Sequence, residues 1–343
     1  MKNYGLSMSI FITMTLLALS SCVNSELIEP EIIGEQENNQ LVINISAPVE
    51  AKTRAHDGYY LRYVAKLFPL YNGSSLDSKN MRRKEILEDG FEENKIVFDS
   101  VDPNVKYRIM VFADYIPSNT LNSKNGYNDY HYNTSSSNET VYMITNPESP
   151  SSNTLSPEFF NNDNYDCFSM SDTIHKTSKR REVNYVLKRA VAKVKWIDTS
   201  SAPGSLDYVS FSAFRIFNSF NQTTSTRLSS LTLPNFTIHS YELPKNDAEA
   251  VFYFYTFASP NSEKINVGFS TKADEIETPW VIKQTEIPVR QNYITNVKGV
   301  LLPQSATGDD PGNGDTVTSE DDMLILNVST DQDWEKEVVE QPI

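Results

Sequence analysis

Residues that could carry out catalysis are sparse in this chain of 343 residues. The four histidines, His56, His131, His175 and His239, stand in different segments, and none has metal-ligand spacing to another His or to Cys. No Gly-rich phosphate loop, Gly-X-Ser-X-Gly elbow or Cys/His nucleophile pattern occurs. We therefore expect no enzyme, no catalytic residue, no metal site and no cofactor.

Cys22 is the residue with the clearest chemical expectation. It follows an apolar run, Ile10 to Leu19, which is too short to span a bilayer as a mature helix and is typical of an export signal. The residues Leu19-Ser20-Ser21-Cys22 resemble the bacterial lipoprotein signal, in which the cysteine is acylated and becomes the first residue. We predict a signal peptide over 1–21 and a lipid on Cys22. The alternative is an ordinary secretory cleavage site with an incidental cysteine.

Acylation of Cys22 would leave Cys167, the second of the two cysteines, without a disulfide partner. Residues 22–40 contain several glutamates and no basic residue, which indicates an acidic tether that holds the rest of the chain away from the membrane.

Arg54 marks a candidate protease site. The preceding stretch places Leu41, Ile43 and Ile45 on one face at period two, with Asn44 and Ser46 on the other, which is typical of a half-buried strand. A loop-like segment with Lys52 and Arg54 follows, so an arginine-specific protease could cut there and release 41–54. An ordinary surface arginine is the alternative reading of Arg54.

The far end of the chain nearly repeats this strand. The sequence Leu-Ile-Leu-Asn-Val-Ser at 324–329 matches Leu-Val-Ile-Asn-Ile-Ser at 41–46 in order. Leu324, Leu326 and Val328 correspond to the three alternating apolar residues of the first strand. Either the two strands can fill one groove, or the second completes its own domain and the similarity is coincidental.

Short strand candidates with alternating or apolar patterns recur between these two ends, and no convincing long amphipathic helix interrupts them. We predict an all-β chain of two tandem β-sandwich domains over 41–185 and 186–302, an acidic linker over 303–322 and a strand-bearing segment over 323–343. Met81 to Gly90 is the one short helix candidate. Residues 117–157, rich in Asn, Ser, Thr and Tyr, are expected to be a surface loop or a partly disordered insertion.

The charge pattern excludes one class of partner. A net charge of −15 argues against nucleic acid, because phosphate binding needs a basic face. The basic residues of Lys188 to Trp196 alternate with apolar ones, and we interpret them as the solvated face of a strand.

Several short motifs together resemble the fimbrillin family, subunits of the type V pili of Bacteroides-like bacteria. They are Cys22, the strand before Arg54, Val64-Ala65-Lys66-Leu67 leading to Tyr71-Asn72-Gly73, the stretch Lys188 to Val194, and Arg290-Gln291-Asn292-Tyr293 with the strand to Val300. The resemblance implies transthyretin-like or immunoglobulin-like sandwich domains, an outer-membrane lipoprotein with a palmitate-type anchor on Cys22, proteolytic removal of the first strand, and assembly with other fimbrial subunits by strand exchange.

The sequence therefore favours a structural subunit of a cell-surface fimbria that serves adhesion. A surface lipoprotein that binds glycans without polymerising is the main alternative, in which exposed tyrosines of 127–142 would form a stacking platform.

Overall fold

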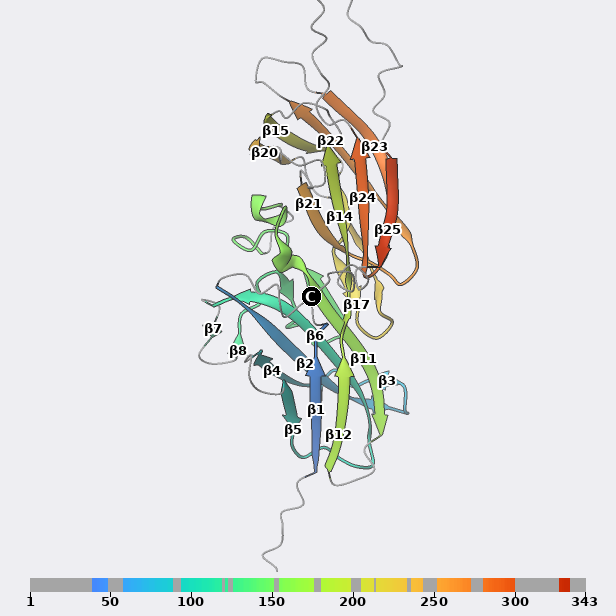
Figure 1. Cartoon of the computed structure of the whole chain (residues 1–343). Coiled ribbons are helices and arrows are strands. Elements are labelled where there is room, and N and C mark those ends of the chain that lie inside the picture. Colours follow the sequence, from blue (N-terminus) through green and yellow to red (C-terminus); the bar gives the residue numbers. More distant parts are fainter. Residues whose placement is uncertain are drawn as a thin grey trace, which may run out of the picture. The chain divides into compact units, whose positions relative to one another are not determined.

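The computed structural model describes residues 39–48, 58–88, 94–118, 121–122, 126–150, 154–175, 180–198, 205–212, 214–232, 236–242, 252–272, 280–299 and 327–333. These residues all fall within one compact unit, 39–343. Strands dominate them, joined by the short 3-10 helices η2 (Pro157–Phe159) and η3 (Asp163–Tyr165), and no α-helix occurs in the described ranges. The predicted all-β class is confirmed (Figure 1). The two-domain division and its boundaries stay a prediction.

The longest pair of strands lies at the centre of a six-stranded sheet. Its members are β13 (Lys188–Arg189), β11 (Cys167–His175), β6 (Lys106–Pro117), β2 (Tyr59–Tyr71), β3 (Ser75–Leu76) and β4 (Arg82–Leu87). β2 and β6 run antiparallel from Tyr59 opposite Pro117 to Pro69 opposite Tyr107. The Asn72-Gly73 turn expected after β2 is confirmed, because both residues adopt positive φ and Ser74 N–H donates to Tyr71 O.

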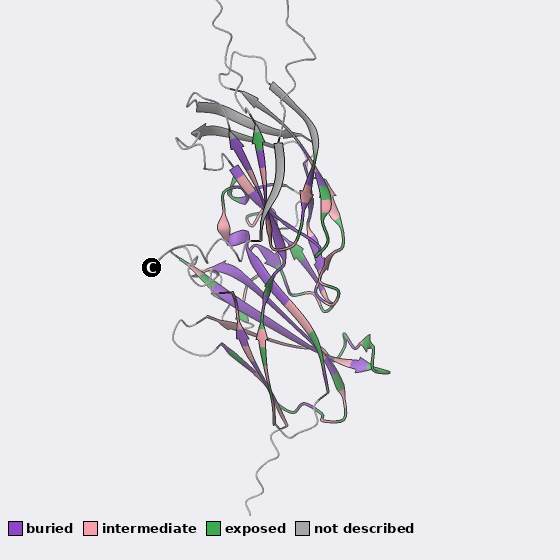
Figure 2. Ribbon diagram, turned by 45° about the vertical axis from the view of Figure 1, so that its right-hand side comes forward, coloured by how far each residue is buried: buried purple, intermediate pink, exposed green. Residues whose placement is uncertain are grey.

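A second, three-stranded sheet covers one face of this pair. It consists of β12 (Arg180–Val186), β1 (Gln40–Ser46) and β5 (Lys95–Phe98), in that order. Alternating side chains of β2 and β6 share one hydrophobic cluster with residues of β1 and β5, as in a sandwich. Figure 2 shows the buried colour along much of β2 and β6, whereas the described side chains of β12 are intermediate or exposed.

The remaining strands form further sheets. A four-stranded sheet has the order β21 (Phe252–Phe257), β14 (Val191–Asp198), β24 (Tyr293–Gly299), β25 (Asn327–Asp333). Another has the order β20 (Phe236–Glu242), β15 (Ser205–Ser212), β22 (Glu263–Lys272), β23 (Trp280–Val289). A third four-stranded sheet has the order β18 (Thr226–Arg227), β17 (Ser219–Asn221), β10 (Thr140–Met143), β9 (Tyr132–Asn133). Two short pairs complete the described strands. They are β16 (Arg215–Phe217) with β19 (Ser230–Thr232), and β7 (Leu121–Asn122) with β8 (Gly126–Tyr127).

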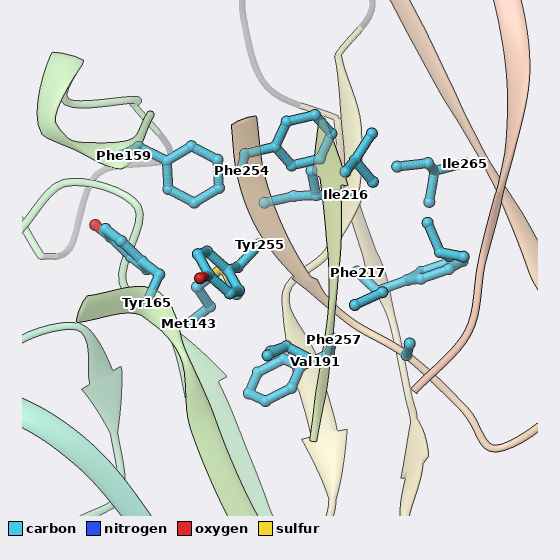
Figure 3. Close-up of a cluster of buried hydrophobic side chains, with 14 of the residues drawn as sticks. Met143, Phe159, Tyr165, Val191, Ile216, Phe217, Phe254, Tyr255, Phe257 and Ile265 are labelled. Carbon is cyan, nitrogen blue, oxygen red and sulfur yellow. The ribbon is translucent and has the colours of Figure 1, made fainter. Parts of the chain in front are cut away.

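An aromatic-rich core lies among these strands (Figure 3). Phe159 of η2 and Phe254 of β21 stack with ring centroids 6.3 Å apart, and Tyr132 of β9 meets Phe257 of β21 at 5.5 Å. Tyr132 and Met143 belong to the segment 117–157, so the expectation of a surface loop or disordered insertion is wrong for this part. The segment adds strands and core side chains instead.

Two other expectations are also corrected. Residues 82–87 form strand β4 on the edge of β2, because pairing with Arg62–Leu67 satisfies their backbone groups and overrides a weak helical preference. Arg189 and Lys193 are buried, where a solvated face was expected. Arg189 Nε lies 2.8 Å from Asp166 Oδ1, and Lys193 Nζ lies 2.7 Å from Asp163 Oδ1, so each buried cation has a carboxylate partner.

Candidate functional site

The strand β1 forms the centre of the candidate site. Leu41, Ile43 and Ile45 are buried in the cluster that the strand shares with β2 and β6. Their alternation is the predicted pattern. Val42, on the opposite face, is also buried at 1 % exposure, whereas Asn44 and Ser46 on that face are half-buried. β1 is thus apolar on one face along its length and on the other face near its beginning.

Backbone pairing holds β1 along both edges. It runs parallel to β12, with Leu41 opposite Arg181 and Ser46 opposite Val186. It runs antiparallel to β5, with Leu41 opposite Phe98 and Asn44 opposite Lys95. Because β1 lies between two strands, its departure would leave unpaired backbone groups on both neighbours as well as an apolar slot.

Polar side chains attach the outward face of β1 to the strands beside it. Asn44 Nδ2 donates to Glu182 Oε1 at 2.8 Å and to Asn184 Oδ1 at 2.7 Å, both on β12. Gln40 Nε2 donates to Asp99 Oδ1 at 2.9 Å, just beyond β5. These partners could not be predicted from the sequence, because β1 pairs with a strand about 140 positions later and such pairing leaves no local signal.

The segment that joins β1 to β2 carries the predicted cleavage residue. Arg54 lies outside the described residues, as does Cys22. The chain is described again from Gly58, and Tyr59 at the start of β2 stacks on His131 with ring centroids 5.9 Å apart. Tyr130 and Tyr165 contact the same imidazole ring at 4.7 and 4.2 Å.

The side chain of His131 is fully buried, and these three rings pack against it. Neither ring nitrogen has a hydrogen-bond partner within the described part of the chain. Burial lowers the pKa of His131 to about 3, because the charged imidazolium would lose its hydration without gaining a partner. The ring is therefore neutral at physiological pH and packs as an aromatic side chain against Tyr59 at the start of β2.

Of the three predicted donor residues, the structure describes only Val328. Leu324 and Leu326 lie outside the described residues. Val328 belongs to β25, which pairs antiparallel with β24 of the same chain, Val328 opposite Val297. The structure thus places 327–333 at an edge of its own sheet and does not bring Val328 together with β1. A donor strand would have to leave this edge first.

The tyrosines of 127–142 offer little stacking surface. Tyr132 is buried, Tyr127 and Tyr130 are half-buried, and Tyr142 is exposed at 43 %. Within the described ranges, no three His, Cys, Asp or Glu side chains are grouped so that they could hold a metal ion. Among the same residues, no helix is long and apolar enough to cross a membrane.

The fold and site define an all-β protein of packed sheets whose first described strand is inserted between two others. The chain belongs to a family of unknown function, DUF6562, whose model matches residues 34–339. A search of curated proteins found no match.

Several solved structures are similar to the chain. One is a candidate cell adhesion protein of Bacteroides eggerthii, with 11 % identity, TM-score 0.45 and coverage of 85 % of this chain and 95 % of that one. Another is the tip fimbrial protein of Porphyromonas gingivalis with C-terminal truncation, with 11 % identity, TM-score 0.40 and coverage of 84 % and 98 %. A third is a structure from Bacteroides thetaiotaomicron that is described as a candidate polysaccharide-binding protein, with 10 % identity, TM-score 0.41 and coverage of 76 % of this chain and 92 % of that one.

Proposed function

We propose that the chain is a structural subunit of a cell-surface fimbria, assembled by protease-triggered donor-strand exchange and serving adhesion. The observation that carries the proposal is the position of β1, which is buried between β12 and β5 and is followed by a segment with a candidate cleavage residue, Arg54. The sequence resemblance to fimbrillins supports the same reading.

Cleavage after Arg54 would turn β1 into a segment held only by non-covalent contacts. Its three inward aliphatic side chains contribute about 1.5 to 3 kcal/mol each, on the order of 5 to 9 kcal/mol together before ordering costs. An empty slot would also leave backbone donors and acceptors of β5 and β12 unpaired. A strand of similar pattern from another subunit would remove both costs.

The segment 324–329 is the proposed replacement. Leu324, Leu326 and Val328 would occupy the pockets of Leu41, Ile43 and Ile45. Residues 327–333 would first detach from β24, where they occupy a sheet edge and not a sheet centre. The linker 303–322, with a root-mean-square reach of about 25 Å if flexible, would let the strand reach a neighbouring subunit. Such a head-to-tail contact does not close on itself and so builds a filament.

The remaining parts of the proposal concern location and partners. Cys22 would carry a lipid that anchors the precursor in the bacterial outer membrane, and the direct partners would be other fimbrial subunits, either copies of this chain or related ones. A surface receptor would complete the adhesive function.

Deletion of Met323 to Ile343 tests the assignment. The full-length and truncated proteins are treated with an arginine-specific protease and compared by gel filtration and electron microscopy. We expect fibres from the full-length chain and monomers from the truncated one. Arg54→Gln, which keeps the C-terminal segment but removes the cut, serves as the matched control and should also stay monomeric. Equal polymerisation of the truncated protein would show that 324–329 is not the donor.

The alternative function, glycan binding without polymerisation, predicts a different outcome of the same treatment. The exposed ring of Tyr142 is the feature that it would use. A protease-treated protein that remains monomeric, binds on a glycan array and loses this binding with Tyr142→Ala would favour it over the fimbrial subunit.

A further inference from the structure

Asn44 is held by side chains of β12 at one particular position of the slot. Its Nδ2 donates both to the carboxylate of Glu182 and to the amide oxygen of Asn184, at 2.8 and 2.7 Å. Asn44 and Asn184 are direct partners in the parallel register. A strand that occupies this slot therefore meets two hydrogen-bond acceptors at its fourth position, counted from Leu41.

The same face of the slot is apolar two residues earlier. Val42 is buried at 1 % exposure. An amide side chain placed there would lose its hydration, and burying a polar group without a partner is unfavourable. The outward face of the slot thus accepts an amide at position 44 and disfavours one at position 42.

The C-terminal strand carries its asparagine at the equivalent place. In the alignment of 324–329 with 41–46, Asn327 corresponds to Asn44. We propose, on the basis of the function proposed above, that Asn327 sets the register of the incoming strand by taking the place of Asn44 against Glu182 and Asn184.

Other registers are excluded by particular residues. A shift by one residue turns every side chain to the opposite face. A shift by two in one direction places Asp322 in the pocket of Leu41, which would bury a charge. A shift by two in the other direction fills the three pockets with Leu326, Val328 and Thr330, and places Asn327 at the buried position of Val42. Two residues oppose this last register: Asn327 at the buried position of Val42, and Thr330, whose hydroxyl would enter the pocket of Ile45. The register still keeps two aliphatic residues in the pockets, so it is the nearest competitor of the proposed one.

Cysteine pairs can report the register in the full-length chain. Ser46 lies opposite Val186, which is 69 % exposed. In the proposed register residue 329 takes the place of Ser46, so Val186→Cys with Ser329→Cys should link neighbouring subunits. Val186→Cys with Asp331→Cys should link them only in the register shifted by two. Cys167 is buried and common to both variants.

We expect the parent chain, cut by an arginine-specific protease, to form fibres that crosslink through the first pair only. Asn327→Val should allow crosslinks through the second pair, and the preference for the first should fall about tenfold, the usual effect of losing one charge-assisted hydrogen bond. Asn327→Asp should slow assembly, because its carboxylate would face Glu182.

Addition of Glu182→Lys to Asn327→Asp should restore assembly. If the Asn327 substitutions acted only by disturbing the pairing of β25 with β24, Glu182→Lys on β12 would not restore assembly. The charge exchange therefore tests the contact between residue 327 and β12 specifically. If no fibre forms from the parent chain, the proposed function itself fails, and the register proposal with it. If fibres form but Asn327→Val keeps the first crosslink unchanged and the rescue is absent, the register proposal alone is overturned.

Discussion

Arg62 and Asp114 face each other at paired positions of β2 and β6 and form a two-point ion pair. Nε of Arg62 donates to Oδ1 at 2.9 Å and Nη2 donates to Oδ2 at 2.7 Å, and both side chains are fully buried. Asp129 adds a third contact to the same guanidinium, 3.0 Å from Nη1. This contact of Asp129 joins the segment after β8 to the long central strands β2 and β6.

Removal of one partner of this buried pair should destabilise the protein strongly. Arg62→Ala leaves Asp114 buried and uncompensated, which costs about 3 to 5 kcal/mol in free energy of unfolding. The matched control is Lys264→Ala, since Lys264 pairs with Glu286 on the surface with both side chains more than 60 % exposed, and its loss should cost less than about 1 kcal/mol. Urea unfolding measures both. Similar losses from the two variants would contradict the importance assigned to burial.

His131 should make the stability of the protein depend on pH. Its pKa is about 3 in the folded state and 6.5 for the ordinary imidazole, so the unfolded chain binds more protons between these values. The contribution of the neutral His131 ring to the free energy of unfolding is fully present above about pH 6.5. It falls as the pH drops towards 3, by about 1.4 kcal/mol for each pH unit well below 6.5. His131→Phe keeps a flat ring and removes this term.

The comparison is the slope of unfolding free energy against pH between pH 6 and pH 4 for the two proteins. Carboxylates contribute equally to both, so the difference reports His131. Parallel slopes would show that the imidazole is protonated in the folded protein or is exposed to water.

The strand β1 shows how much period-two patterning can predict. Leu41, Ile43 and Ile45 point to the core as expected, and β6 also begins with the alternation seen in the sequence, because a strand with one buried face must alternate. What patterning could not supply was the identity of the neighbours. The parallel partner β12 comes about 140 residues later, so the hydrogen bonds of Asn44 could not be predicted.

The burial of several cationic side chains is the second feature that the sequence pattern could not predict. Arg62, Lys66 and Arg189 occur within strand-like runs, where a charged residue normally indicates the solvent face. Their carboxylate or carbonyl partners lie on other strands or loops, such as Ser136 O, which accepts from Lys66 Nζ at 2.7 Å. In the same way, Tyr132 is buried although its neighbours are polar, because β9 and β10 pair with each other and cover the core.

Cys22 should carry the lipid that anchors the precursor. The expected result is incorporation of a fatty-acid probe into the wild-type protein in the native bacterium and its absence from Cys22→Ala. Cys167→Ala, which removes the other cysteine, should keep the label. Since a single acyl chain holds a protein only marginally, we expect more than one chain on Cys22. Label that persists in Cys22→Ala would refute the assignment.

Arg54 should be the residue after which the precursor is cut. Loops with small and polar residues are preferred sites of proteolysis, and Arg54 is followed by Ala55. N-terminal sequencing of material sheared from the cell surface should therefore begin at Ala55. Arg54→Gln should abolish this terminus, whereas Lys52→Gln should leave it unchanged. Mature protein that begins at Cys22 would count against cleavage.

The central claim is that β1 leaves its slot and that a strand of another subunit replaces it. The most direct measurement is the composition of purified fibres, by mass spectrometry under denaturing conditions after assembly from protease-treated full-length chain. The account predicts that the fibres contain residues 55–343 and that the fragment ending at Arg54 is released into the soluble fraction. If the purified fibres also contain the fragment Leu41 to Arg54, in an amount equal to that of residues 55–343, β1 has not left its slot and the account is contradicted.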